Sequence, residues 1–138
     1  LAAARALLDK KQKELGSAIV DLGEGTTTLT VFEEGELVHF QIIPLGAAQI
    51  TNDLAISMRT SVNIAEKMKQ QYGTCLPKTL GRKEQPISLA SLGTEGRGYC
   101  TRREAASLIE RRATEILQLV QKELKKIFAG KSKKGAAV

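Results

Sequence analysis

The feature that most constrains the fold is a glycine-containing turn between two segments typical of β-strands. Residues 17–22 (SAIVDL) form a short apolar run, as in a buried strand. Residues 26–32 (TTTLTVF) are rich in β-branched and aromatic side chains. Gly23 and Gly25 lie between them, and a second turn at residues 33–36 precedes a returning strand at 37–43. The sequence therefore predicts three consecutive antiparallel strands.

Helices are expected on both sides of these strands. Residues 2–15 are rich in Ala and Lys and free of Gly and Pro, which predicts a helix that ends at Gly16. After Pro44 and Gly46 break the strand pattern, a helical pattern runs from Ile50 to Tyr72. We expect an interruption at Thr60 and Ser61, with Ser61 capping the second helix and Gly73 ending it.

The last helix has the clearest signature. Residues 74–98 carry Pro77, Pro86 and several glycines, and predict a loop with one strand at 87–92. Thr101 and Glu104 then form a capping box. Apolar residues recur at three- and four-residue steps from Ala105 to Ile127, which predicts one helix with an apolar face. The order of elements fits one half of an α/β layered domain.

Composition excludes some functions and leaves others open. The chain has three Phe, two Tyr and no Trp, so aromatic platforms for single-stranded nucleic acid are scarce. No apolar run approaches the roughly 20 residues that span a bilayer. Cys75 and Cys100 lack a CxxC or Cys/His cluster, so reduced thiols of a cytoplasmic protein are expected, with a structural disulfide as the alternative. A start at Leu1 rather than Met favours an excised piece of a longer protein.

Charge is unevenly distributed. Residues 1–50 hold 4 Lys or Arg against 7 Asp or Glu, and residues 51–138 hold 17 against 8. Between Lys122 and Lys134, six lysines are opposed only by Glu123. Such a run attracts nucleic acid, anionic lipid or an acidic peptide, or it is a solvated helix end favoured by the helix dipole. Nucleic-acid binding is not expected, because no recognised nucleic-acid motif accompanies the charge.

The turn between the first two strands has residues suited to phosphate. In Asp21–Thr28 (DLGEGTTT), the glycines let the backbone turn sharply and direct successive N–H groups outward. Asp21, at the end of its strand, is placed to hold Mg²⁺ through water, and Thr26 and Thr27 add hydroxyl donors. Taken alone, the same residues also fit an ordinary β-hairpin with a glycine turn.

The wider sequence supports the phosphate interpretation by resemblance. Residues 21–28 resemble the second phosphate motif of the actin, sugar-kinase and DnaK superfamily. Residues 43–55 (IPLG, then ITNDLA) and 65–73 (AEKMKQQYG) resemble stretches of the FtsA family of bacterial cell-division proteins. Residues 1–16 resemble the interdomain helix before the phosphate loop, and residues 101–128 resemble the long helix of that family. PilM-type pilus proteins are the nearest similar group.

This resemblance implies an actin-like, ribonuclease-H-like fold, of which the chain would be a fragment of the second ATPase domain. The three-stranded antiparallel start would pack on helices, with an inserted smaller subdomain. Residues 1–15 would be the interdomain helix and 16–58 the first part of subdomain 2A with the phosphate loop. Residues 59–128 would be the inserted subdomain 2B, and 129–138 a truncated return towards subdomain 2A, where GAAV would open another strand.

The resemblance also implies ATP and Mg²⁺ as ligands. The residues that match the phosphate loop and the glycine after the hairpin are Asp21, Gly23, Gly25, Thr26, Thr27 and Gly46. Glu66 and Lys69 match an acidic and basic pair near the ribose and adenine. Their i, i+3 spacing places them on one helical face, which also fits an ordinary surface ion pair.

Three positions depart from the family pattern and are expected to weaken ATP binding. Glu24 replaces a Gly, and its carboxylate near a triphosphate costs about 1–4 kcal/mol unless it points to solvent or helps to hold the metal. Ala47 also replaces a Gly, at a cost of about 1 kcal/mol if that position needs a positive φ. Thr28 stands where Asp is common. We expect at most a weak ATPase in the intact protein and no activity from this segment, because the other nucleotide motifs lie outside it.

The function implied by the resemblance is that of an adaptor. FtsA-like proteins bind ATP, form actin-like filaments and recruit FtsZ through its C-terminal peptide, and they attach to the cytoplasmic face of the cell membrane. The resemblance implies that the membrane segment would lie outside this chain. Candidate residues for the partner peptide are Arg97, Arg102 and Arg103, joined by Arg111 and Arg112, although these also fit a solvated helix face. The alternatives are an active ATPase or kinase of the same superfamily, a PilM-like protein, and a basic nucleic-acid-binding protein.

Overall fold

The computed structural model describes residues 6–135 and has an α/β fold with two compact units. Unit 1 comprises the described residues up to Gly46 together with those from Ile116 onward, and unit 2 comprises Ala47–Glu115. The units divide the chain at positions other than the expected subdomain boundaries. The assignment of subdomains 2A and 2B therefore stays a prediction.

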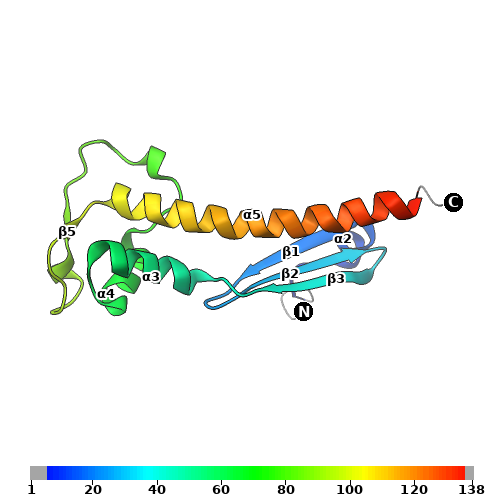
Figure 1. Cartoon of the computed structure of the whole chain (residues 1–138), viewed down its shortest axis with the longest axis horizontal. Coiled ribbons are helices and arrows are strands. Elements are labelled where there is room, and N and C mark those ends of the chain that lie inside the picture. The colour runs from blue at the N-terminus through cyan, green and yellow to red at the C-terminus, as the bar shows by residue number, and fades with distance from the viewer. Residues whose placement is uncertain (1–5, 136–138) are drawn as a thin grey trace. The chain divides into compact units, whose positions relative to one another are not determined.

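Unit 1 contains the three-stranded antiparallel sheet that the sequence predicts. Its strands are β1 (Ser17–Leu22), β2 (Thr27–Glu33) and β3 (Glu36–Ile43), with β2 in the centre (Figure 1). Each strand begins and ends within one residue of the expected bounds. The register pairs Asp21 of β1 with Thr28 of β2.

The turn between β2 and β3 explains why this hairpin forms. Glu34 and Gly35 both have positive φ, 51° and 82°. Two such residues make a turn whose twist matches that of the flanking strands. The Gly35 N–H donates to the Lys13 carbonyl oxygen at 3.1 Å, so the turn is also joined to the segment that precedes the sheet.

The helix before the sheet is shorter than expected. Helix α2 spans Lys10–Leu15, and the residue that caps its N-terminus, Asp9, forms a capping box with Gln12. The capping residue starts a new helix within the stretch for which the sequence predicted one continuous helix. The expected end at Gly16 is confirmed, with φ 93°. Residues 1–5 lie outside the described residues.

The core of unit 1 lies between the sheet and the last helix. Helix α5 spans Arg102–Gly135, and its Val120 packs with Leu29, Val31 and Ile43 of the sheet (Figure 1). The helix extends past the expected end at Phe128 as far as Gly135. The expected return towards subdomain 2A after residue 129 stays a prediction. Residues 136–138, where a strand was expected to open, lie outside the described residues.

Unit 2 is built from two helices, a small two-stranded ribbon and the first turns of α5. Helices α3 (Ala47–Met58) and α4 (Val62–Tyr72) are separated at the expected place, and Ser61 caps α4. The strand expected at 87–92 is only partly right. Residues Ile87–Ser88 form β4, which pairs with β5 (Tyr99–Cys100), while Leu89–Ser91 form the 3-10 helix η2. A further short 3-10 helix, η1, spans Pro77–Thr79.

The core of unit 2 is aliphatic, as composition indicates. Its fully buried members Leu54, Ala65, Met68 and Ala105 come from α3, α4 and α5. The predicted capping box opens α5, because Thr101 N–H donates to Glu104 Oε2 at 2.8 Å and Glu104 N–H donates to Thr101 Oγ1 at 3.1 Å. Over the described part of the chain, we find no helix with the length and apolar character needed to cross a bilayer.

Candidate functional site

The expected phosphate loop is a tight turn with an open outer side. It connects β1 to β2, and the Gly23 N–H donates to the Thr26 carbonyl oxygen at 2.9 Å. Glu24, Gly25 and Thr26 are exposed. A Cβ placed on Gly25 would meet no atom within 4 Å. The backbone there is accessible to a ligand, which fits the expected phosphate cradle.

Gly46 packs directly against the backbone of this loop. A Cβ placed on Gly46 would lie 2.4 Å from the Glu24 carbonyl oxygen and 2.5 Å from that of Gly23. Since real side chains do not approach backbone oxygens so closely, Gly is required for the two segments to touch. Thr27 adds a second link, because its buried hydroxyl donates to the Leu45 carbonyl oxygen at 2.8 Å. The shape of the loop therefore depends on residues 45 and 46.

These contacts change how two of the candidate phosphate residues are understood. The Thr27 hydroxyl proton is donated inside the protein, whereas Thr26 is exposed. Phosphate binding by Asp21, Gly23, Gly25, Thr26 and Thr27 stays a prediction. Thr27 supports the loop whether or not it also meets a ligand.

Two of the expected obstacles to nucleotide binding change in the structure. Glu24 is exposed, and a side chain in solvent is the condition under which its charge is tolerated. Ala47 is the first residue of α3 and is not among the non-glycine residues with positive φ. The backbone strain expected at Ala47 is therefore absent.

No pre-formed metal site accompanies the loop. Among residues 6–135, no group of three or more His, Cys, Asp or Glu side chains could hold a metal ion. Asp21 is exposed next to the end of β1. A lone carboxylate suits a Mg²⁺ ion that keeps most of its water shell and is held mainly by a phosphate ligand. Water-mediated metal binding by Asp21 stays a prediction.

Unit 2 brings together the other candidate ligand pair. Lys69 Nζ lies 2.7 Å from Glu66 Oε2, and both side chains are on one face of α4. Thr51 of α3 completes the cluster: its hydroxyl donates to Glu66 Oε2 at 2.6 Å and accepts from Lys69 Nζ at 2.7 Å. Gln70 Nε2 donates to Glu66 Oε1 at 2.9 Å. The pair is thus part of a network that spans two helices.

This network shifts the ionisation of Glu66. The hydrogen bond from Lys69 is the largest cause and that from Thr51 the next, and together they hold the pKa of Glu66 below its usual range despite some desolvation. The carboxylate therefore stays charged at neutral pH and can accept hydrogen bonds from a ligand.

Sequence reasoning missed Thr51 and a second link between helices. Asp53 of α3 forms a bidentate pair with Arg112 of α5, at 2.8 Å for Nε to Oδ2 and 3.0 Å for Nη2 to Oδ1. Both Thr51 and Asp53 lie in the ITNDLA stretch. A signal for Thr51 was present, since it shares the buried stripe of α3 with Ile50, Leu54 and Ala55, and a polar side chain there needs a partner.

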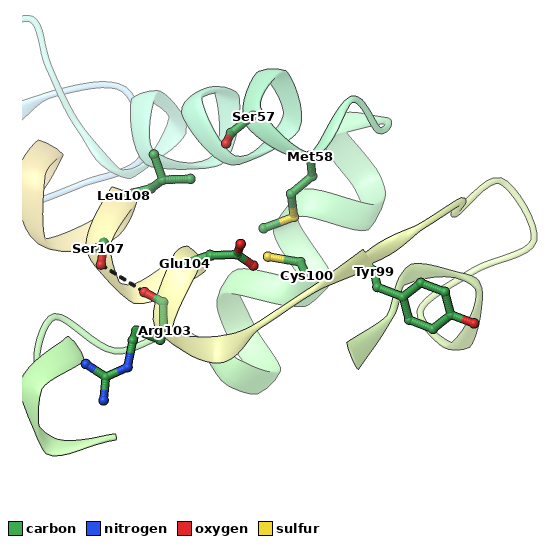
Figure 2. Close-up of a pocket in the computed structure, with 8 residues that line it drawn as sticks. All are labelled: Ser57, Met58, Tyr99, Cys100, Arg103, Glu104, Ser107 and Leu108. Atoms are coloured by element: carbon green, nitrogen blue, oxygen red, sulfur yellow. Dashed lines mark hydrogen bonds between the residues drawn. The ribbon is translucent and has the colours of Figure 1, made fainter. Parts of the chain in front are cut away.

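One of the candidate partner residues, Arg103, lines a pocket of about 510 Å³ in unit 2. Figure 2 shows the apolar side chains of Met58 and Leu108 in it, with Glu104 and Ser107 of α5 and the Cys100 thiol. The Arg103 guanidinium donates to the Leu80 carbonyl oxygen.

Arg102 and Arg97 differ in their surroundings. Arg102 Nε donates to the Tyr72 carbonyl oxygen at 3.2 Å, whereas Arg97 is exposed. Arg102 and Arg103 therefore help to hold the preceding loop, and partner binding by the three arginines stays a prediction.

Burial, with the nearby charge of Glu104, raises the pKa of the Cys100 thiol to about 11, so this sulfur is a poor nucleophile at neutral pH.

Comparison with solved structures defines the class of fold. Crystal structures of MreB 5 of Spiroplasma citri, bound to AMPPNP and to ADP, align with 90% of this chain at a TM-score of 0.69 and 20% sequence identity. The alignments cover 39% and 40% of those chains. The expected α/β fold, with a three-stranded antiparallel sheet and helices, is therefore confirmed and is shared with MreB 5.

Comparison with known sequences then shows the family. The family model for cell division protein FtsA matches residues 18–137. FtsA of Bacillus subtilis (strain 168) is 40% identical over 125 residues, that of Pseudomonas aeruginosa 38% over 126, and that of Escherichia coli (strain K12) 33% over 124. These alignments cover 91%, 91% and 90% of this chain but only 28%, 30% and 29% of the relatives. The chain belongs to the FtsA family and spans less than a third of its relatives' length.

Proposed function

We propose that the chain is the nucleotide-binding and partner-binding segment of an FtsA-type adaptor. Such an adaptor links FtsZ filaments to the cytoplasmic face of the cell membrane, assembles into actin-like filaments and reaches the membrane through a segment outside this chain. The observation that carries the proposal is the family match over residues 18–137, within which the Gly23–Thr26 turn is open to a ligand. The full-length form, meaning the chain within a protein of its relatives' length, is the molecule to test.

Nucleotide binding is the first part of the proposal. The open backbone of the turn at Gly25 offers N–H groups to phosphate oxygens, and Asp21 holds Mg²⁺ through water. Bound Mg²⁺ would neutralise part of the phosphate charge. Glu66 and Lys69 contact the nucleoside portion of ATP, where a charged carboxylate accepts from hydroxyl groups. The structural neighbour MreB 5 was crystallised with AMPPNP and with ADP, which supports a nucleotide as the ligand.

This part is tested by calorimetric titration of Mg·ATP into the full-length form. Lys69→Ala is expected to weaken binding by about 10-fold or more, the scale of one charged hydrogen bond. Lys126→Ala is the matched control, because Lys126 pairs with Glu123 at the same i, i+3 spacing with 2.6 Å between Nζ and Oε1. A wild-type protein that does not bind Mg·ATP, or equal effects of the two variants, would contradict nucleotide binding by Lys69.

Recruitment of FtsZ is the second part. The pocket in unit 2 combines apolar walls from Met58 and Leu108 with the cationic Arg103 (Figure 2). Exposed Arg97 lies two residues before the start of β5. Apolar walls beside the Arg103 guanidinium suit a short peptide with apolar and acidic side chains. We therefore assign the C-terminal peptide of FtsZ to this pocket, with Arg97, Arg102 and Arg103 as its cationic contacts.

Charge reversal separates this assignment from a general charge effect. Arg97→Glu and Arg103→Glu are expected to weaken binding of a fluorescent FtsZ C-terminal peptide to the full-length form, by about 10-fold each. Arg111 is also a candidate from the sequence, but it is exposed on α5 and does not line the pocket. Arg111→Glu therefore makes the same charge change away from the pocket and is expected to change the affinity by less than about 2-fold. Because Arg103 also binds the Leu80 carbonyl, circular dichroism must show that its variant is folded. Equal loss in all three variants would contradict the pocket assignment.

A further inference from the structure

A buried hydroxyl connects the two side chains proposed to contact the nucleoside. Thr51 is 3% exposed, and its Oγ1 lies within hydrogen-bond distance of both Glu66 Oε2 and Lys69 Nζ, at 2.6 and 2.7 Å. It also lies 3.3 Å from the Ala47 carbonyl oxygen. A threonine hydroxyl can donate one hydrogen bond and accept others, so a single oxygen fixes the positions of an anion and a cation.

The network leaves a defined capacity for a ligand. In the described contacts, Lys69 donates to Thr51 and Glu66, which leaves one N–H of the ammonium group. Glu66 accepts from Thr51, Lys69 and Gln70, which leaves one of the roughly four acceptor positions of a carboxylate. One donor beside one acceptor matches a hydroxyl group, which both accepts and donates. The sugar hydroxyls of a nucleoside have this chemistry.

Helix packing alone does not require this hydroxyl. Helices α3 and α4 already pack through Ile50, Leu54, Ala65 and Met68, all buried in one apolar cluster. A valine at position 51 would fill nearly the same space without any polar group to satisfy. Burying a hydroxyl instead gains little stability beyond the hydrogen bonds that it makes. Thr51 forms hydrogen bonds with the two ionised side chains of α4, Glu66 and Lys69. We infer that the Thr51 hydroxyl serves to position these two side chains.

We propose that Thr51 is a positioning residue, whose hydroxyl holds Lys69 and Glu66 so that their remaining donor and acceptor face one sugar hydroxyl of a bound nucleoside. This inference rests on the proposed nucleotide binding and deepens it. It assigns to Thr51 no contact with the ligand.

The first arm of the test measures the geometry without a ligand. The pKa of the Glu66 carboxyl is followed by ¹³C NMR without nucleotide in the full-length form of the wild type, of Thr51→Val and of Thr51→Ser. We expect the pKa to move up towards its usual range in Thr51→Val, since a bond that lowers it is lost, and to return in Thr51→Ser. An unchanged pKa in Thr51→Val would overturn the inference.

The second arm measures binding of ATP and of 2′,3′-dideoxy-ATP to the full-length form. Thr51→Val is expected to weaken binding of ATP by about 5–10-fold and of the dideoxy analogue by less than about 2-fold, with Thr51→Ser close to wild type. Equal loss for both nucleotides, or loss in both variants with a lower Tm, would show a merely structural role and overturn the inference.

The two proposals fail in different ways. A wild-type protein that binds neither nucleotide would overturn the proposed nucleotide function and this inference together. A wild-type protein that binds ATP and is weakened by Lys69→Ala, but not by Thr51→Val, would overturn the inference alone.

Discussion

The turn between β1 and β2 in unit 1 is shaped by backbone contact, whereas the cluster around Thr51 in unit 2 is shaped by side chains. In unit 1, Gly46 touches the carbonyl oxygens of Gly23 and Glu24, and no side chain fits between them. In unit 2, hydroxyl, carboxylate and ammonium groups meet across two helices. A close backbone contact is destabilised by any added side-chain atom, whereas the stability of a polar network depends on the charges of its members and therefore on pH. The two regions should therefore respond to different perturbations.

The largest expected effect is that of adding a methyl group behind the turn. Gly46→Ala should lower the free energy of unfolding by about 1–3 kcal/mol, because its Cβ overlaps backbone oxygens that cannot move independently. Gly25→Ala is the control in the same loop, where a Cβ meets nothing within 4 Å, and should change stability by less than about 0.5 kcal/mol. Urea unfolding measures both. Equal effects would show that the loop is not braced by Gly46.

A smaller effect is expected from the ion pair that links α3 and α5 in unit 2. Arg112→Gln should cost about 1–2 kcal/mol, since it removes a bidentate bond to Asp53 whose partners are 26% and 19% exposed. Glu115 contacts the same guanidinium but is 51% exposed, so Glu115→Gln should cost less than about 0.5 kcal/mol. A larger loss in Glu115→Gln than in Arg112→Gln, by urea unfolding, would contradict the comparison.

The smallest expected effect is a pH-dependent contribution of Glu66 to the free energy of unfolding. The turn between β1 and β2 in unit 1 should make no such contribution. The pKa of Glu66 is lowered in the fold, so its contribution to stability is present above the usual carboxyl pKa and is lost as pH falls through the folded value. The difference in unfolding free energy between wild type and Glu66→Gln should stay below about 1 kcal/mol at pH 7 and shrink towards pH 3. Urea unfolding across this range measures it. A difference that grows as pH falls would have the wrong sign.

The sequence predicted the sheet well because its signals are local. Runs of β-formers such as 26–32 and the Glu34–Gly35 turn determine strands and hairpin without help from distant residues. Helix α4 was found for the same reason, since Ser61 caps it locally. The strand expected at 87–92 failed because Ile87–Ser88 pair with distant Tyr99–Cys100 and the chain then turns into η2.

Only some residues of the candidate site could be predicted from the sequence. The loop residues and the Glu66–Lys69 pair could be named, because a motif and a helical spacing mark them. The need for glycine at position 46 and the role of Thr51 could not be predicted from sequence, because both depend on atoms that folding brings together. For Gly46 these atoms are in the Glu24 carbonyl, and for Thr51 they are in the side chains of α4. The expectation of backbone strain at Ala47 was wrong, because α3 begins at this residue, three residues earlier than the sequence indicated.

The measurement that tests the central claim most directly is residue-resolved NMR of the full-length form during titration with Mg·ATP. We predict that the backbone amide signals of Gly23, Gly25 and Thr26 shift as Mg·ATP approaches saturation. The amide of Gly81, where a Cβ also meets open space, serves as an exposed control outside the loop and should not move. If saturating Mg·ATP leaves the three loop signals unchanged, or moves them no more than Gly81, then this turn does not hold the phosphates and the account is wrong.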